Sequence, residues 1–334
     1  MHKLIAALCV SLLFVYVILV RRASPTQFEA SNTKPNLEVK QDRKKSDKEQ
    51  DGLAWHVHTV NLMEPSLVKQ HGRKFSTGKA ILLTGITYDR NGNKSEEASY
   101  DPNDPSKIRA KDVFIYDDLG KKIEKLSYGD NSVLVQKEVF KYEANGQLTR
   151  REHYHPDGTL KEYNAFSYNE AGQLTEEGLY AADGTFISNW VYSYDDAGTR
   201  TGVTRGQGEG YKVVVAYDSG GNITREERYD LRGKLEHQIM NKYDAGGHLI
   251  EGRSNGPGTR FPSRVTQIYD DKGNVIVTKF YEGDKLVGQY RNSYVYDPRG
   301  NWTQRTPRVE YATANKMLIK PELVNFRTIT YYPD

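Results

Sequence analysis

One phrase recurs nine times between residues 88 and 301 of this 334-residue chain. It consists of a Tyr, then Asp, Glu or Asn, two further residues, and a Gly followed by a polar residue, as in "YDRNGN", "YEANGQ" and "YDDKGN". Successive tyrosines lie 23 to 28 residues apart, most often 26. A period of this length indicates one supersecondary unit that is used repeatedly, with each copy stacked on the next. The repeat residues are Tyr88, Gly92, Tyr116, Gly120, Tyr142, Gly146, Tyr168, Gly172, Tyr194, Gly198, Tyr217, Gly221, Tyr243, Gly247, Tyr269, Gly273, Tyr296 and Gly300.

The chemistry of the phrase predicts the corner of a β-hairpin. An Asp or Asn at the start of a turn accepts hydrogen bonds from the following backbone amides, and Gly adopts a positive φ without strain. The flanking residues alternate with a period of two, as in "YKVVVAY", where Tyr211, Val213, Val215 and Tyr217 share one face. An apolar residue usually follows two positions after the Gly and is expected to meet the repeat Tyr across the hairpin. The chain's 24 Tyr and 29 Gly suit such a β-rich body.

Nine hairpin units predict an all-β protein with about eighteen short strands in an antiparallel array. Flat sheets wider than about ten strands are unusual, so we expect a curled or spiral open sheet. Its two edges need protection. We therefore expect an N-terminal β cap at residues 52–80, the nine repeats at 81–306 and a C-terminal cap at 307–334.

The N-terminus indicates a membrane or export segment. Leu4 to Val20 is a run of seventeen residues without a charge, flanked by Lys3 and by Arg21 and Arg22. This length is at the lower limit for crossing a bilayer, and the run lacks a small-x-small cleavage site at its end. Residues 1–22 are thus interpreted as a signal anchor, with a cleaved signal peptide as the alternative. The polar residues 23–51 are expected to be a disordered linker. The predicted location is membrane-anchored and extracytoplasmic, or secreted if the segment is cleaved.

The phrases "YDRNGN", "YDSGGN", "YDDKGN" and "YDPRGN" resemble the tyrosine–aspartate repeats of the RHS/YD-repeat family. The resemblance covers roughly residues 80 to 305. This family includes bacterial polymorphic toxins, insecticidal toxin-complex subunits, a wall-associated protein and animal teneurins. In its large members the repeats form a hollow β-shell around a toxin or peptide. The chain resembles a short, stand-alone member, because it shows neither the family's self-cleaving core nor a C-terminal toxin.

The residues suggest binding rather than catalysis. No nucleophile motif is present, and the recurring Asp and Glu belong to turns, so we predict no enzymatic activity, catalytic residue, cofactor or metal. Two His pairs, His56 with His58 and His153 with His155, are interpreted as surface or cap residues. The net charge of +3 is spread along the chain and indicates no nucleic-acid partner. Tyr163 lies off the parity of the repeat Tyr and is the candidate exposed ring for binding.

Two functions remain open at this point. The first is a membrane-anchored extracytoplasmic β-repeat protein that serves as a binding or structural module at the cell envelope, with a glycan or a protein as ligand. The second is an accessory or remnant of an RHS-type toxin-delivery system that covers a client polypeptide.

Overall fold

The computed structural model describes residues 46–69, 75–196, 198, 200–205, 211–256, 263–312, 317–321 and 323–333. These residues form 21 antiparallel strands, a single-turn helix α2 (Asp47–Gln50) and a 3-10 turn η1 (Asp130–Ser132). The all-β prediction is confirmed. The strands are β1 (Val57–Lys69), β2 (Phe75–Tyr88), β3 (Lys94–Asp101), β4 (Asp104–Tyr116), β5 (Lys122–Tyr128), β6 (Leu134–Tyr142), β7 (Leu148–Tyr154), β8 (Leu160–Tyr168), β9 (Leu174–Ala181), β10 (Phe186–Tyr194), β11 (Arg200–Arg205), β12 (Tyr211–Tyr217), β13 (Ile223–Asp230), β14 (Leu235–Tyr243), β15 (Leu249–Asn255), β16 (Arg264–Tyr269), β17 (Val275–Glu282), β18 (Lys285–Tyr296), β19 (Trp302–Ala312), β20 (Met317–Pro321) and β21 (Asn325–Tyr331).

The repeats account for the eighteen strands from β2 to β19. Each repeat Tyr ends one strand, and the next strand begins two residues after the repeat Gly. The expected cross-hairpin pairs are present: Tyr142 faces Leu148, and Tyr168 faces Leu174. A one-residue register shift follows each of these pairs, so every hairpin carries a bulge beside its corner. Bulges increase the local twist, which bends the sheet at each repeat.

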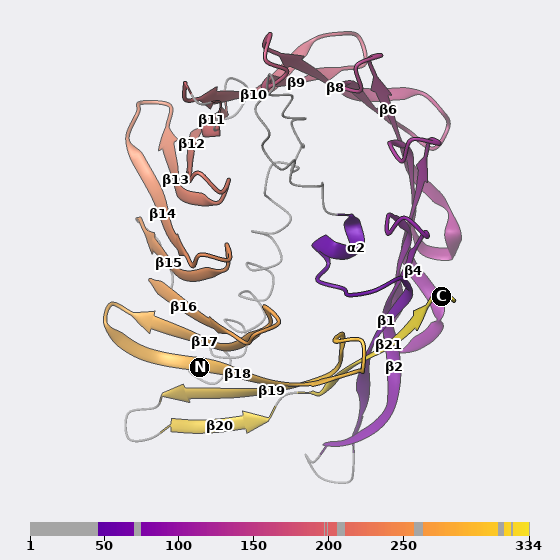
Figure 1. Cartoon of the computed structure of the whole chain (residues 1–334), viewed down its shortest axis with the longest axis vertical. Coiled ribbons are helices and arrows are strands. Elements are labelled where there is room, and N and C mark those ends of the chain that lie inside the picture. Colours follow the sequence, from indigo (N-terminus) through magenta and orange to yellow (C-terminus); the bar gives the residue numbers. More distant parts are fainter. Residues whose placement is uncertain are drawn as a thin grey trace.

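The expectation of an open sheet is wrong, because the sheet closes into a barrel of twenty strands. Strand β1 pairs with β2 on one side and with β21 on the other, and β21 in turn pairs with β19. Figure 1 shows the resulting ring of strands. The strands β1 and β21, which lie in the two segments expected to be caps, therefore pair with each other and leave neither edge of the repeat array unpaired. The accumulated twist of eighteen strands brings them together. Among the described residues, strand β20 pairs only with β19, so it lies outside the ring.

Helix α2, close to the start of the described residues, lies on the inner side of the ring (Figure 1). Residues 46–51, expected to end the disordered linker, instead form a capped helical turn and the bend after it. The predicted membrane segment, Leu4 to Val20, lies outside the described residues. Within the part that is described, no helix is long and apolar enough to span a membrane.

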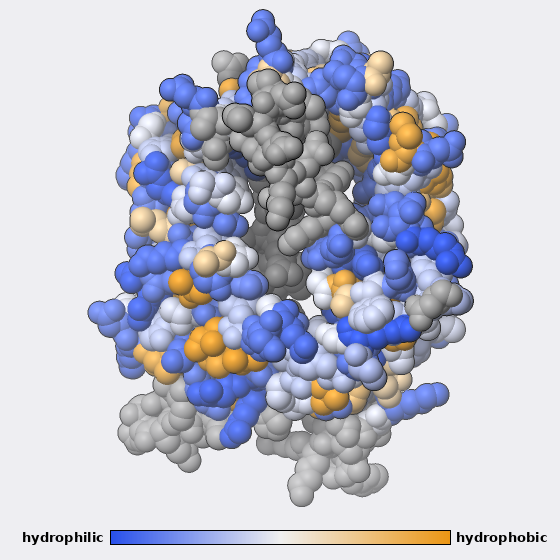
Figure 2. All heavy atoms as spheres, in the orientation of Figure 1, coloured by the Kyte–Doolittle hydropathy of each residue, from blue (hydrophilic) through white to orange (hydrophobic). Residues whose placement is uncertain are grey.

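The inner face holds the hydrophobic core. The inner face is the face whose side chains contact α2 and Asp51, such as Tyr88 and Tyr116. It can be followed around the ring because directly paired residues on neighbouring strands lie on the same face. One cluster of buried residues runs along β7 to β12: Leu148, Phe166, Leu174, Tyr192, Val203 and Val215. A second cluster lies at the closure and consists of Leu53, Val57, Val60 and Tyr88. On the face seen in Figure 2, hydrophilic residues predominate and the hydrophobic ones form small separate groups.

Candidate functional site

The repeat turns have one geometry throughout the barrel. At the first turn, Asp89 Oδ1 accepts hydrogen bonds from the backbone N–H groups of Asn91 and Asn93, at 2.9 and 2.8 Å. The nine repeat glycines have φ values between +75° and +89°, in the region that residues with a side chain rarely adopt. These residues therefore hold the hairpin corners, which is a structural task.

A second bond connects most repeats to the repeat before them. In six repeats the Tyr hydroxyl donates to a backbone carbonyl of the preceding repeat, over 2.7 to 2.9 Å. Burial raises the pKa of both Tyr142 and Tyr168 to about 12. The six donor–acceptor pairs are Tyr116–Lys94, Tyr142–Lys122, Tyr168–Leu148, Tyr194–Leu174, Tyr243–Ile223 and Tyr269–Leu249.

Tyr88 breaks this pattern because no repeat precedes it. Its side chain is only 1% exposed, and its hydroxyl donates to Asp51 Oδ2 at 2.5 Å, just after α2. Lys94 Nζ approaches the same Asp51 oxygen at 3.4 Å and Glu97 Oε2 at 3.0 Å. Burial by itself lowers the pKa of Lys94, but Asp51 and Glu97 outweigh burial, so this pKa lies above the ordinary value. Asp51 thus supplies the acceptor that the missing repeat would have provided.

Asp47, at the start of α2, makes a second anchor. Its Oδ2 accepts from the backbone N–H of Lys94 at 2.9 Å and from the Tyr116 hydroxyl at 3.1 Å. The turn itself is preorganised by a capping box, in which Ser46 and Glu49 satisfy each other's backbone N–H groups. Two carboxylates four residues apart therefore fasten α2 to the ends of β2, β3 and β4.

The third anchor comes from the opposite end of the chain. Asn301 Oδ1 accepts from the Ala54 N–H at 2.7 Å, and Asn301 Nδ2 donates to the Ala54 carbonyl at 3.0 Å. Asn301 is 2% exposed, and Leu53 beside this contact is 6% exposed. The side-chain amide of Asn301 thus bonds to both the N–H and the carbonyl of Ala54, as the backbone of a neighbouring strand would. We call Tyr88, Lys94, Tyr116 and Asn301 the inner-wall seat, and residues 46–56 the seated segment.

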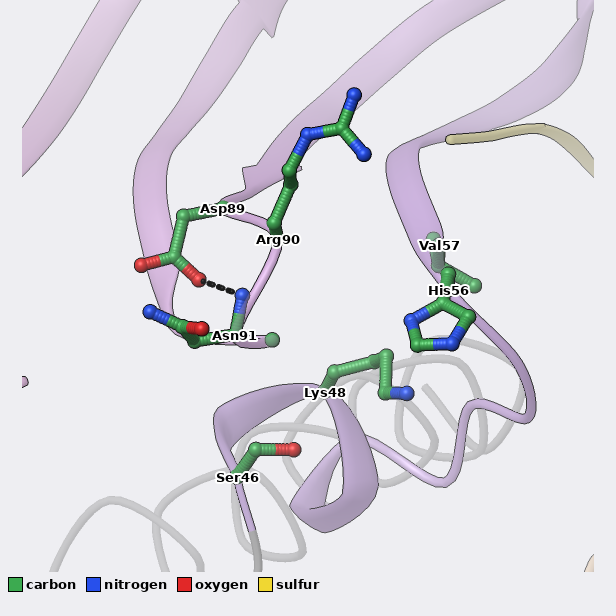
Figure 3. Close-up of a pocket in the computed structure, with 8 residues that line it drawn as sticks. Ser46, Lys48, His56, Val57, Asp89, Arg90 and Asn91 are labelled. Carbon is green, nitrogen blue, oxygen red and sulfur yellow. Dashed lines mark hydrogen bonds between the residues drawn. The ribbon is translucent and has the colours of Figure 1, made fainter. Parts of the chain in front are cut away.

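Two small cavities flank the seated segment. The first, of about 230 Å³, lies between the turn at Asp89–Gly92 and the residues Ser46, Lys48 and His56 (Figure 3). Its cations are already engaged, since Lys48 Nζ donates to the Trp55 carbonyl and Arg90 lies 4.8 Å from the Tyr332 ring centroid.

The second cavity, of about 180 Å³, is lined by Asp47, Gln50, Asp51, Lys94, Phe114 and Lys122. Lys122 Nζ lies 4.8 Å from the centre of the Phe114 ring. Burial lowers the pKa of Lys122 below its ordinary value. In the described part of the chain, no carboxylate oxygen reaches this amine within ion-pair distance. A cation thus faces the space beside Gln50.

Sequence reasoning missed Lys94 and Lys122, although a signal was available. Six repeats carry an apolar residue two positions after the Gly, such as Leu148 and Leu174, whereas the first two repeats carry Lys. At Lys94 and Lys122 this departure from the repeat consensus coincides with the part of the inner wall that faces α2. Arg200 is the third cationic departure at this position.

A polar network also crosses the inner wall from β7 to β9. Asn164 receives a bond from Arg151 Nη2 at 3.1 Å and donates to Glu177 at 3.1 Å. His153 Nε2 lies 3.0 Å from Asn164 Oδ1, so the interpretation of His153 as a surface or cap residue is wrong. Burial raises the pKa of Glu177, and the nearby Arg151 counteracts this rise. Each of these groups is satisfied within the network, which suits a structural role.

The candidate binding ring Tyr163 lies on the outer face and is half-buried. Tyr180 from β9 stacks on it at a centroid distance of 5.2 Å, and Arg150 from β7 lies 3.5 Å from its centre. Both faces of the ring are thus covered. His56 and His155 are exposed, and the His58 ring contacts Tyr332 at 4.6 Å. Among the described residues, no three His, Cys, Asp or Glu side chains form a metal-binding group.

No family model and no curated protein matches the chain. Among solved structures, it is similar to a chain of the Photorhabdus luminescens Tc holotoxin pore, with 15% identity, a TM-score of 0.36 and coverage of 78% of this chain and 15% of the other. The complex TcdB2–TccC3 without its hypervariable region gives 16% identity, a TM-score of 0.36 and the same coverage. A porin-like protein from Bacteroides uniformis gives 11% identity, a TM-score of 0.32 and coverage of 82% and 96%. The chain thus spans about 15% of the length of the toxin chains, and all three TM-scores are too low to assign a family or function.

Proposed function

We propose that this chain is a non-enzymatic binding module whose closed sheet encloses a polypeptide segment against its inner wall, and that it acts at the cell envelope. The observation that carries the proposal is the seated segment itself. Residues 46–56 belong to no strand before Val57, yet Asp47, Asp51 and Ala54 are bound to the inner wall. A wall with matched acceptors and donors for a non-strand peptide is a peptide-binding surface.

The closed sheet supports an enclosing role. Pairing of β1 with β21 removes the two edges of the repeat array, so the wall is continuous around the ring. Tyr163, the ring considered for sugar stacking, has both faces covered. A polypeptide is therefore a better supported ligand than a glycan. The Asp residues of the turns accept backbone hydrogen bonds, which supports a role without catalysis.

Protease protection tests enclosure. The recognition sequence of a site-specific protease is inserted directly before Ser46, and a matched insertion is made in the exposed turn at residues 155–158. If the wall shields the polypeptide, the first site is cut at least about 10-fold more slowly than the second in the folded protein. Equal cleavage rates in two equally folded variants would refute enclosure.

The location at the envelope rests on the uncharged run from Leu4 to Val20. Protease treatment of intact cells, followed by detection of the repeat body, tests it. Digestion from outside with a membrane-bound remnant is the expected result. Protection until lysis, in a host without an outer barrier, would place the repeats inside the cell and overturn this part of the proposal.

A further inference from the structure

The inner-wall seat contains a buried donor that the repeats leave unmatched. The hydroxyls of six later repeat tyrosines donate to carbonyls of the preceding repeat, but Tyr88 has no preceding repeat. Its ring is almost completely buried, so without Asp51 its hydroxyl would lose its acceptor. A buried donor without an acceptor is unfavourable. The first repeat therefore requires an acceptor from outside the sheet.

The remaining donors of the seat specify where a second carboxylate must lie. The Lys94 backbone N–H donates to Asp47 Oδ2, and the Tyr116 hydroxyl, which already has the Lys94 carbonyl as acceptor, lies 3.1 Å from the same oxygen. Lys94 Nζ faces Asp51. Two carboxylates separated by one helical turn satisfy this arrangement, because residues i and i+4 lie on the same side of a helix. This arrangement fits an acidic helical turn.

The seated segment is held mainly by side chains and single backbone contacts. Helix α2 has four residues, too few to be stable alone, so its shape depends on the capping box and the seat. Beside Gln50, the cavity of about 180 Å³ presents the Lys122 amine. The cavity therefore presents a cation beside position 50, where this chain has Gln and not an acidic residue.

We infer that the inner-wall seat is a recognition site for an acidic peptide with two aspartates four residues apart, and that residues 46–56 are its intramolecular ligand, which a partner segment of the same pattern replaces. This rests on the proposed function and names the class of polypeptide that the wall binds. Because a tethered ligand has a high effective concentration, the partner segment competes with it and binds more weakly to the unmodified chain.

Peptide binding to the full chain tests the inference. The double variant Asp47→Asn/Asp51→Asn weakens the intramolecular contact, and the probe is a fluorescent peptide of residues 46–56, "SDKEQDGLAWH". We expect the variant to bind this peptide at least about 10-fold more tightly than a control peptide carrying the same two Asn substitutions. The unmodified chain should bind the acidic peptide at least about 10-fold more weakly than the variant does. A peptide with Gln50→Glu should bind about 2- to 5-fold more tightly than the original.

Two results would overturn the inference: a folded double variant that binds neither peptide, or one that binds both with equal affinity. If the double variant does not fold, the unmodified chain is used with excess peptide, and hydrogen exchange of the Ala54 amide is followed. The acidic peptide should speed this exchange and the Asn peptide should not; no difference between them would overturn the inference. Enclosure is tested separately, because peptide binding with rapid cleavage before Ser46 would refute enclosure and leave the seat intact.

Discussion

The hydroxyl of Tyr168 donates a hydrogen bond to the backbone carbonyl oxygen of Leu148, 2.8 Å away and 20 residues earlier in the chain. The same bond recurs in five other repeats, so the tyrosine of the repeat phrase has two tasks. Its ring fills the inner face of its own hairpin, and its hydroxyl binds the hairpin before it. In these six repeats the tyrosine therefore also connects its own unit to the preceding one.

Replacing Tyr168 by Phe should lower the free energy of unfolding by about 1 kcal/mol, because the Leu148 carbonyl loses a buried donor while the ring stays in place. Chemical denaturation with urea measures this. Tyr163→Phe on the same strand is the matched control and should change stability by less than about 0.5 kcal/mol. Equal effects of the two substitutions would show that the hydroxyl bond contributes nothing.

Substitutions at Gly221 measure the cost of a positive φ separately from any steric clash. Its φ is +78°, and a Cβ placed there would meet no atom within 4 Å, so a side chain causes strain without a clash. Gly221→Val should destabilise the protein by about 1–2 kcal/mol or more, since β-branched residues are strained in this region. Gly221→Asn should cost less, because Asn tolerates it. Thermal unfolding compares the two, and identical melting temperatures would contradict the strain argument.

Alkaline pH should unfold the barrel cooperatively. Burial raises the pKa of Tyr142 and Tyr168 to about 12, whereas tyrosines of an unfolded chain ionise near pH ~10. Between these values the folded state binds more protons than the unfolded state, so stability is complete below about pH 10 and falls as pH rises toward about 12. Ultraviolet absorbance of tyrosinate should rise in one steep step together with loss of the β-sheet circular dichroism. A shallow titration centred near pH ~10, with the sheet intact, would show that these hydroxyls are not buried.

Asn301→Ala should release the seated segment. The substitution removes both bonds to Ala54 and the bond from Asn301 Nδ2 to the Tyr331 hydroxyl, and it leaves the other seat residues in place. We expect hydrogen exchange of the Ala54 amide to accelerate by about 10-fold or more. Asn222→Ala is the matched control, because Asn222 occupies the same repeat position but bonds to Asp218 within its own turn. If Ala54 exchanges at the same rate in both variants, the Asn301 contact does not hold the segment.

Closure of the ring can be tested with proline. Ile329 in β21 pairs with Val60 of β1, so Ile329→Pro places a proline inside the strand that closes the ring and should cost at least about 2 kcal/mol. Ile319→Pro is the control, since Ile319 lies in β20, outside the ring, and pairs with Glu310 of β19. Its effect should be clearly smaller. Chemical denaturation measures the free energy of unfolding of both variants. Equal losses of stability would indicate that the β1–β21 pairing does not support the barrel.

The hairpin corners were predictable because their cause is local. Asp or Asn at the turn entry and Gly at positive φ act within five residues, so a short phrase such as "YDRNGN" is sufficient evidence. The count of eighteen repeat strands follows from nine such phrases. The pairing of Tyr142 with Leu148 is also local, since both residues flank one turn.

The seat was not predicted, because its partners are far apart in the chain. Asn301 and Ala54 are 247 residues apart, and nothing near either residue indicates the other. Lys94 and Lys122 were visible as departures from the repeat, but their inward cations have meaning only once a carboxylate is opposite them. His153 was misjudged for the same reason, as its neighbour Asn164 is on the adjacent strand.

Short-range chemistry in the chain was therefore enough to establish the strands, the turns, the repeat and the all-β class. Closure was decided by the tertiary structure, because the bend per hairpin is small and only its sum over the repeats determines whether β1 meets β21. The inner-wall seat likewise depends on closure, since Asn301 reaches Ala54 only when the last repeat lies beside the first strand. A sum of small twists is a property of the whole sheet, and no single phrase of the sequence contains it.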